Sequence, residues 1–445
     1  MLLAALAAAV VGQGGFFGAA QWCVTALMGV AVVLAAAGWP FGRDDLGGGF
    51  VAAGVLFAVW ALVRAAGAPA AGLSWVLFGA GTAAVFVVCR RLDTGSRGLV
   101  VDGLVAVGAV VAATGWLGVV AHHRPWGLPS AGLWRAASVL TYANAAAALL
   151  VALTVVVLSR LTASPGSVRL CLTAAGLLCG VGATLSRAGV AALAVGVLVL
   201  CLLRGTRVVV RAAAGPAAGA AVAFAGLLPS VPAAARPDPA VALAALACGA
   251  GIAVVMQRSP RAAIAVLTGG AALCAALILI NAAPSVDAAA RSLAASRISL
   301  ASPARAGETS AAIRVIGRHP LVGAGPGRAT LRWRGPDGSI RADSYSHDEY
   351  LQVLADLGII GTALLTMFIA AAVRVLWQAR LSMPGPAWAG AVAAAAALAV
   401  HSGFDFLWHI PAIPLTVAAL AGCAVTSTGR PQPLKTAATQ REEKL

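Results

Sequence analysis

A histidine stands between a polar stretch and a long apolar run, in the segment SYSHDEYLQVLADLGIIG. Ser346 and Glu349 have the S-x-x-E spacing of a capping box, which predicts that His347 lies in the first turn of the next helix. Free amides and the positive end of the helix dipole there favour an anion and a neutral imidazole, whereas Asp348 and Glu349 favour the imidazolium. The pattern is typical of an acid–base residue beside an anion, or of a histidine hydrogen-bonded at a membrane interface.

Upstream lies a glycine-rich segment, IGRHPLVGAGPGR. Gly323, Gly325 and Gly327 allow a tight backbone whose amides can hold phosphate, although a plain turn has the same composition. The segment lacks Gly-Lys-Ser/Thr and a preceding strand, so it is neither a Walker loop nor a dinucleotide fingerprint. The candidate binding residues of this region are Arg314, His319, Gly323, Gly325, Gly327 and Arg328.

Arg187, in TLSRAGVAAL, lies between two apolar runs that leave room for only a tight turn. An arginine at such depth is costly unless it has a partner or a water-filled cavity. Its fixed charge and forked donors suit bidentate binding of phosphate. The alternative is a side chain that extends to the outer interface.

Three potential metal ligands, His401, Asp405 and His409, are spaced four residues apart in HSGFDFLWHIP. Such spacing places ligands on one helix face. However, the segment ends in Pro411, Trp408 suits a membrane interface, and the sequence has no second ligand cluster. We therefore expect no metal site.

The elements that position these residues are apolar helices. Hydrophobic residues make up 60% of the 445-residue chain, charged residues only 10%, and the mean hydropathy is +0.92. Apolar runs of about 17 to 25 residues, each long enough to cross a bilayer, recur along the chain. We predict an all-α, polytopic integral membrane protein with 12 to 14 transmembrane helices. The eight cysteines fall in apolar segments and are expected to act as small core residues.

The formal charge of +16 comes from arginines that are spread through short loops rather than gathered in a basic domain, which argues against nucleic-acid binding. Their alternation between successive loops predicts a multi-pass membrane protein with both termini cytoplasmic. The predicted divisions are helices in 1–281, a large extracytoplasmic loop in 282–349, helices in 350–426 and a cytoplasmic tail in 427–445. Between Asn281 and Glu349 nine arginines face six acids, a balance that an anionic ligand would explain.

Three blocks together resemble the O-antigen ligase and polymerase family: the turn from Thr184 to Gly189, RHPLVGAGPG in the loop, and SHDEYLQVLADLGIIG at its end. Their order in the chain also resembles that family. HSGFDFLWHIPA is similar to the last outer motif of the family. WRAASVLTYAN, from Trp134 to Asn144, is a weaker likeness of an Arg-to-Asn segment.

The resemblance implies roles for individual residues. Arg187 corresponds to an arginine at the membrane edge, and His347 to a histidine that precedes an N-x-x-L segment, where this chain has Asp348 in place of Asn. Arg305 ranks first, before Arg314 and Arg297, as the loop arginine that precedes a W-x-x-A-L stretch. The expected tryptophan is Thr309 in this chain.

The resemblance also implies a glycosyltransferase that takes a glycan from an undecaprenyl pyrophosphate carrier at the outer face and joins it to an acceptor hydroxyl. Arginines would stabilise the pyrophosphate leaving group without a metal or cofactor, and His347 would accept or orient the acceptor proton. The expected partners are this lipid-linked donor, a glycan or lipid acceptor and membrane lipids. Ligase and polymerase differ only in the acceptor, and both stay open.

The alternative from another class is a multi-helix transporter, because the chain has no soluble catalytic domain. Transporters tend to contain inverted repeats, broken helices and ionisable groups at the bilayer midplane. Here the polar residues gather in the outer loops, and Asp102 is the main acid near a span.

Overall fold

The computed structural model describes residues 1–38, 45–258, 303–335, 337–382 and 385–425. In the first half of the chain the helices are α1 (Leu2–Val11), α2 (Gly18–Gly38), α3 (Asp45–Arg64), α4 (Pro69–Val76), α5 (Thr82–Arg91), α6 (Thr94–Val120), α7 (Ala143–Ala163), α8 (Val168–Ala183), α9 (Arg187–Arg204) and α10 (Thr206–Ala225). The second half contains α11 (Pro239–Arg258), α14 (Pro303–Arg318), α15 (Glu349–Ser382), α16 (Pro386–Ser402) and α17 (Ala412–Ala424).

Eight helical segments in the described ranges are long and apolar enough to cross a membrane. The segment Pro69–Arg91 is one of them, because a π-helical turn at Leu77–Gly81 joins α4 to α5. Further apolar helices of 10–17 residues include α1, α8, α16 and α17. The prediction of a helical membrane protein is confirmed. The number of 12 to 14 spans stays a prediction, and the span expected at 262–281 lies outside the described residues.

The core of the bundle is α7, whose spanning window is 94% buried and which packs against α6, α8, α9 and α16. The outer helices are apolar on their exposed surfaces, as shown by Leu198, Leu202 and Val373. In water such surfaces would favour aggregation, whereas hydrocarbon solvates them without penalty. The described cysteines are free thiols, of which Cys89, Cys171 and Cys179 are buried as expected, whereas Cys23 is exposed.

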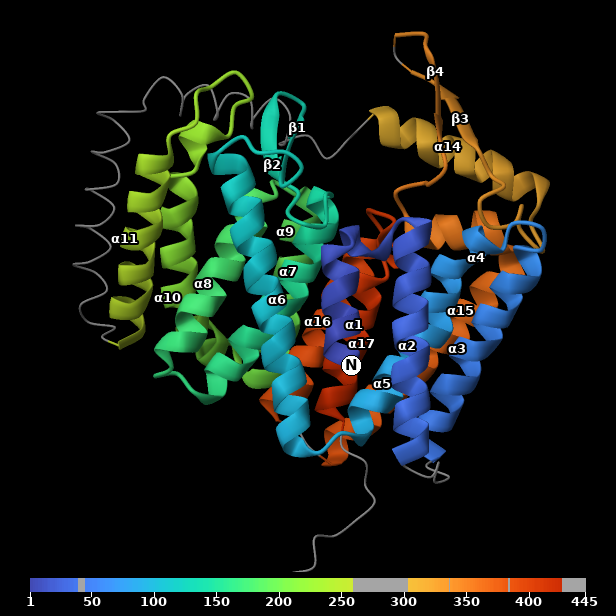
Figure 1. Cartoon of the computed structure of the whole chain (residues 1–445), viewed down its shortest axis with the longest axis horizontal. Coiled ribbons are helices and arrows are strands. Elements are labelled where there is room, and N and C mark those ends of the chain that lie inside the picture. The colour runs from blue at the N-terminus through green and yellow to red at the C-terminus, as the bar shows by residue number, and fades with distance from the viewer. Residues whose placement is uncertain (39–44, 259–302, 336, 383–384, 426–445) are drawn as a thin grey trace, which may run out of the picture.

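Two small antiparallel hairpins depart from a purely helical chain. β1 (Gly127–Ser130) pairs with β2 (Leu133–Ala136), and β3 (Leu331–Arg334) pairs with β4 (Ile340–Asp343). Figure 1 shows both hairpins and α14 at the same end of the helices, which we call the loop end. The opposite end, where α5, α7 and α9 finish, carries Arg90, Arg160 and Arg204, and we call it the arginine-rich end.

The large loop is joined to α15 through main-chain hydrogen bonds. α15 leaves helical geometry at Gly358, with φ 68° and ψ −168°. At this break the amide of Ile359 donates to the carbonyl of Pro320 at 2.9 Å, and the amide of Gly325 donates to the carbonyl of Asp356 at 2.9 Å. Backbone groups freed by the break are therefore satisfied by the loop, as the interior of a membrane protein requires.

Candidate functional site

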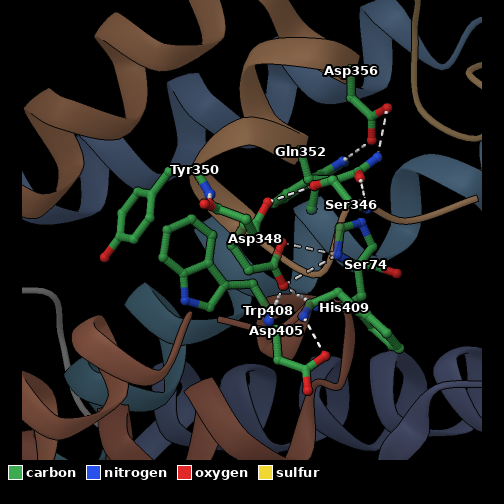
Figure 2. Close-up of polar contacts among 12 residues, drawn as sticks. Ser74, Ser346, Asp348, Tyr350, Gln352, Asp356, Asp405, Trp408 and His409 are labelled. Atoms are coloured by element: carbon green, nitrogen blue, oxygen red, sulfur yellow. Dashed lines mark hydrogen bonds and ion pairs between the residues drawn. The ribbon is translucent and has the colours of Figure 1, made fainter. Parts of the chain in front are cut away.

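His347 lies two residues before Glu349, the first residue of α15, and not in the first turn of the helix as predicted. The N-cap is Asp348, whose Oδ1 accepts hydrogen bonds from the amides of Tyr350 (2.9 Å) and Leu351 (3.1 Å). The predicted capping box is wrong, because Ser346 donates its hydroxyl to the carbonyl of Asp348 and its amide to Gln352 instead. Figure 2 shows Ser346, Gln352 and Asp356 in one chain of polar contacts. An Asp adopts the N-cap conformation readily and supplies a charged acceptor, which explains this choice.

The imidazole of His347 is paired with a carboxylate from α14. Its Nδ1 lies 3.1 Å from Oε2 of Glu308, and the two side chains are 22% and 8% exposed. Burial lowers the pKa of His347, but the contact with Glu308 and the negative charges of Asp405, Glu308 and Asp343 outweigh burial and raise it. The backbone of His347 has φ +47°, an uncommon value for a residue other than glycine. Nδ1 of His347 and Oε2 of Glu308 form a close ion pair, although neither atom has a partner in hydrogen-bond geometry among the described residues.

A third group completes a cluster around this pair. One ligand atom each from Glu308, Asp343 and His347 lies within 4.8 Å of the others. Two carboxylates and an imidazole are a donor set that a divalent cation can accept. The expectation that the protein needs no metal is therefore a prediction for experiment, and these three residues are where a cation would bind.

The residues of HSGFDFLWHIP have separate partners. Both carboxylate oxygens of Asp405 accept from the Tyr142 hydroxyl at 2.7 Å, and Asn144 also donates to this carboxylate. His409 lies on the other side of the segment, with Nδ1 3.1 Å from the buried carboxylate of Glu349. Figure 2 shows the carboxylate of Asp405 apart from the imidazole of His409. The side chains of His401, Asp405 and His409 therefore do not converge on one point in the described structure.

Glu349 ties the first turn of α15 to this segment. Its side chain is fully buried and accepts hydrogen bonds from the amides of Trp408 and His409. Glu349 lies in the first turn of α15, where the positive end of the helix dipole favours a carboxylate. Through these contacts and its contact with Nδ1 of His409, Glu349 anchors the start of α15, two residues after His347, rather than capping the helix.

Arg187 is the first residue of α9, after a turn of three residues that ends α8. Ser186 caps α9 by accepting from the amide of Gly189 at 3.1 Å. The turn is connected to Asp405, because Arg135 donates to the carbonyl of Thr184 at 2.9 Å and to the side chain of Asn144 at 2.8 Å. The predicted tight turn is confirmed, and Arg187 is partly exposed at the loop end.

Arg305 lies in the first turn of α14 and is partly exposed. Its positive charge acts on His401, at the end of α16. Asp405 acts in the same way on both His401 and His347. His401 is fully buried, and neither ring nitrogen has a hydrogen-bond partner among the described residues. The charge of Arg305 thus reaches His401, and that of Asp405 reaches both His401 and His347, whereas Arg297 is outside the described residues.

The glycine-rich segment has a structural role that differs from the predicted phosphate nest. Gly323, Gly325 and Gly327 all have positive φ, of 70°, 97° and 68°. The amide of Gly323 donates to His319, and those of Ala324 and Gly325 donate to carbonyls of α15. A Cβ at Gly323 would collide with the backbone of Asp356. Gly323 allows close packing against α15, and Gly325 allows close approach to the carbonyl of Arg64 at the end of α3. The amides of both glycines donate to carbonyls and are not free for a ligand.

The remaining loop candidates lie apart from His347. Arg314 donates to the carbonyl of Arg332 at 2.8 Å, and Arg328 donates to the carbonyl of Ala66. His319 is exposed at the end of α14. Both arginines thus donate hydrogen bonds to backbone carbonyls, and neither contacts His347 or Glu308 in the described structure.

Sequence reasoning missed four residues of this site: Tyr142, Glu308, Asp343 and Phe406. The rings of Tyr142 and Tyr345 stack on Phe406, with centroids at 5.3 Å and 4.9 Å, and His347 meets the same ring edge-on at 5.0 Å. Phe406 thus contacts the imidazole of His347 directly, and Tyr142 and Tyr345 pack on Phe406. Tyr142 lies in WRAASVLTYAN and Phe406 in HSGFDFLWHIPA, so the family resemblance of these two segments could have pointed to them. No motif in the sequence marks Glu308 or Asp343.

Comparison with known proteins bears on this region directly. Residues 239–366 match the family profile described as O-antigen ligase, a segment that includes α11, α14, both strands of the second hairpin and the start of α15. A comparison with curated proteins finds no match. The matched segment contains Glu308, Asp343 and His347. It confirms the resemblance to the O-antigen ligase and polymerase family and supports assignment of the chain to it.

Proposed function

We propose, from this family assignment, that the chain is a membrane glycosyltransferase of the ligase or polymerase type, which moves a glycan from an undecaprenyl pyrophosphate carrier to an acceptor hydroxyl. The observation that carries the proposal is the His347–Glu308 pair, 3.1 Å apart, within the matched segment. The loop end would face the extracytoplasmic side of a bacterial inner membrane.

In the proposed reaction His347 acts as the general base. With Nδ1 directed at Glu308, Nε2 is the nitrogen left to approach the acceptor hydroxyl. The hydroxyl oxygen forms the new glycosidic bond while the bond to the pyrophosphate breaks. The proton passes to His347, and Glu308 stabilises the imidazolium that forms. This arrangement resembles the base-and-orienting-acid logic of hydrolytic triads.

The leaving group would be bound by arginines. The pyrophosphate takes up the bonding electrons and requires positive charge that is in position before the reaction. Arg187 is partly exposed beside the turn to which Arg135 is bonded, and Arg305 lies near His401 at the same end of the bundle. We assign Arg187 and Arg305 to the pyrophosphate. Arg314 and Arg328 are assigned to the loop backbone on the grounds of their carbonyl contacts.

The test is glycan transfer by purified His347→Gln, normalised to folded protein. Loss of a general base typically lowers the rate by about 10² to 10⁴ fold. His123→Gln is the matched control, because His123 is an exposed histidine at the same end of the molecule, in the segment before β1. Transfer in detergent solution needs no flux across a membrane, so it also separates an enzyme from a transporter. Near-normal turnover of His347→Gln would remove the catalytic role.

A further inference from the structure

The arginine-rich end contains a cavity of about 270 Å³ between α6, α7, α16 and α17. Two arginines, Arg97 and Arg160, share its lining with apolar side chains, among them Val101, Val156 and Leu420. The volume is below that of a site for a drug-sized molecule, for which about 300 Å³ is the lower bound. It suits a small polar group with the beginning of an alkyl chain.

The side chains of Arg97 and Arg160 are each held by a hydrogen bond to a neighbouring residue. Arg97 donates one terminal nitrogen to the carbonyl of Arg90 at 2.6 Å, and Arg160 donates to Oδ1 of Asp102 at 2.5 Å. The Nε of Arg97 is buried and has no hydrogen-bond partner among the described residues. A buried donor without an acceptor costs free energy, and a bound anion oxygen would remove that cost.

The surrounding charges favour an anion. The nearby acids are already engaged: Asp102 lies 3.9 Å from Arg169 in addition to its contact with Arg160, and Asp93 caps α6 by accepting from the amide of Ser96 at 2.9 Å. Positive charge exceeds negative charge at the polar end of the cavity, whereas its walls are apolar. An occupant with both an anionic group and a hydrocarbon part meets both requirements.

We propose that this cavity binds the phosphate group of a phospholipid. The guanidinium forks of Arg97 and Arg160 match phosphate oxygens, and the start of an acyl chain lies along Val101, Val156 and Leu420. The apolar walls are what makes a lipid the occupant rather than free phosphate. The site lies at the opposite end of the helices from His347, so it stands independently of the proposed transfer reaction.

Three probes separate the contributions of phosphate and hydrocarbon. The intact chain in mild detergent is titrated with phosphatidylglycerol, with diacylglycerol of the same chains, and with inorganic phosphate, and binding is read by native mass spectrometry. We expect phosphatidylglycerol to bind at least about tenfold more tightly than either of the others. Equal binding of diacylglycerol would overturn the role of the phosphate, and equal binding of inorganic phosphate would overturn the lipid assignment.

Variants locate the binding. Arg97→Gln should weaken phosphatidylglycerol binding about tenfold, and Ala387→Leu, at an exposed lining position of α16, should weaken it by filling the cavity without a change of charge. Arg207→Gln is the matched control, because Arg207 is exposed in the first turn of α10 and does not line the cavity. Wild-type affinity in both Arg97→Gln and Ala387→Leu would overturn the proposal. An equal loss in Arg207→Gln would also overturn it, since it would indicate diffuse surface attraction.

Discussion

Replacement of Glu308 by Gln tests the arrangement around His347 most directly, because it removes one charge and keeps the shape of the side chain. Coulomb's law gives roughly 5 kcal/mol for unit charges at the observed 3.1 Å with an effective dielectric constant of about 20. His347 is 22% exposed, so water reduces this value. Hydrogen bonds to charged groups in proteins contribute about 1.5 to 3 kcal/mol. We therefore expect turnover to fall about 10- to 150-fold.

The pH dependence gives an independent readout. Neutral His347 is the base, so wild-type activity should rise with pH as the imidazolium loses its proton. Burial lowers the pKa of His347, and the contact with the negative charge of Glu308 raises it. Removal of that charge lowers the pKa, and the acidic limb of the pH–rate profile should move to lower pH in Glu308→Gln. A merely structural role of Glu308 would reduce the amount of folded enzyme without moving this limb.

The assay is single-turnover transfer from an undecaprenyl pyrophosphate-linked glycan, measured across pH and normalised to folded protein. Asp337→Asn is the matched control, an acid-to-amide change at a 58% exposed side chain in the same loop. The reasoning is refuted if Glu308→Gln keeps turnover within about twofold of the wild type, or if its acidic limb moves to higher pH.

Four further predictions follow from the same structure. Arg187→Lys keeps the charge but loses the planar fork, so transfer should fall at least about tenfold in the same assay, and wild-type activity would remove Arg187 from the site. Glu349→Gln breaks the buried pair with His409 and should cost about 3 to 5 kcal/mol of stability, seen as a lower thermal midpoint in detergent; an unchanged midpoint would mean that the pair is not stabilising. A cysteine at Ser339 should react with a membrane-impermeant thiol reagent in intact cells and one at Thr94 should not, and the reverse result would invert the orientation. Chelation of divalent cations should leave transfer unchanged, whereas loss that a cation restores would assign the three-ligand cluster to a metal.

The class of the fold was predictable because it depends on composition and run length. Apolar stretches that exceed the bilayer thickness fix helical spans whatever their packing. The turn at Arg187 was predictable for the same reason, since only a few residues separate two such runs. The hairpin pairing Gly127 with Ala136 was not, because its short strands lack alternating apolar residues.

The candidate site was predictable only for residues that a local sequence pattern marks. His347 was found because it borders a helix start, but the cap was misassigned: both Ser346 and Asp348 are good N-cap residues, and sequence alone does not decide between them. Glu308 lies 39 positions before His347. Their meeting depends on how α14 packs over α15, which no local pattern encodes. The nest was mispredicted because positive φ glycines serve close packing as well as ligand binding.

The break in α15 at Gly358 determines how the outer loop can behave mechanically. Four main-chain hydrogen bonds join residues 320–325 to the helix, at 2.8 to 3.2 Å. At roughly 1 kcal/mol each, they hold the detached state to about one molecule in a thousand. Residues 320–325 are therefore fixed against α15 and do not act as a lid that opens. In the proposed reaction, substrates would reach His347 past this fixed surface, and access would not depend on its movement.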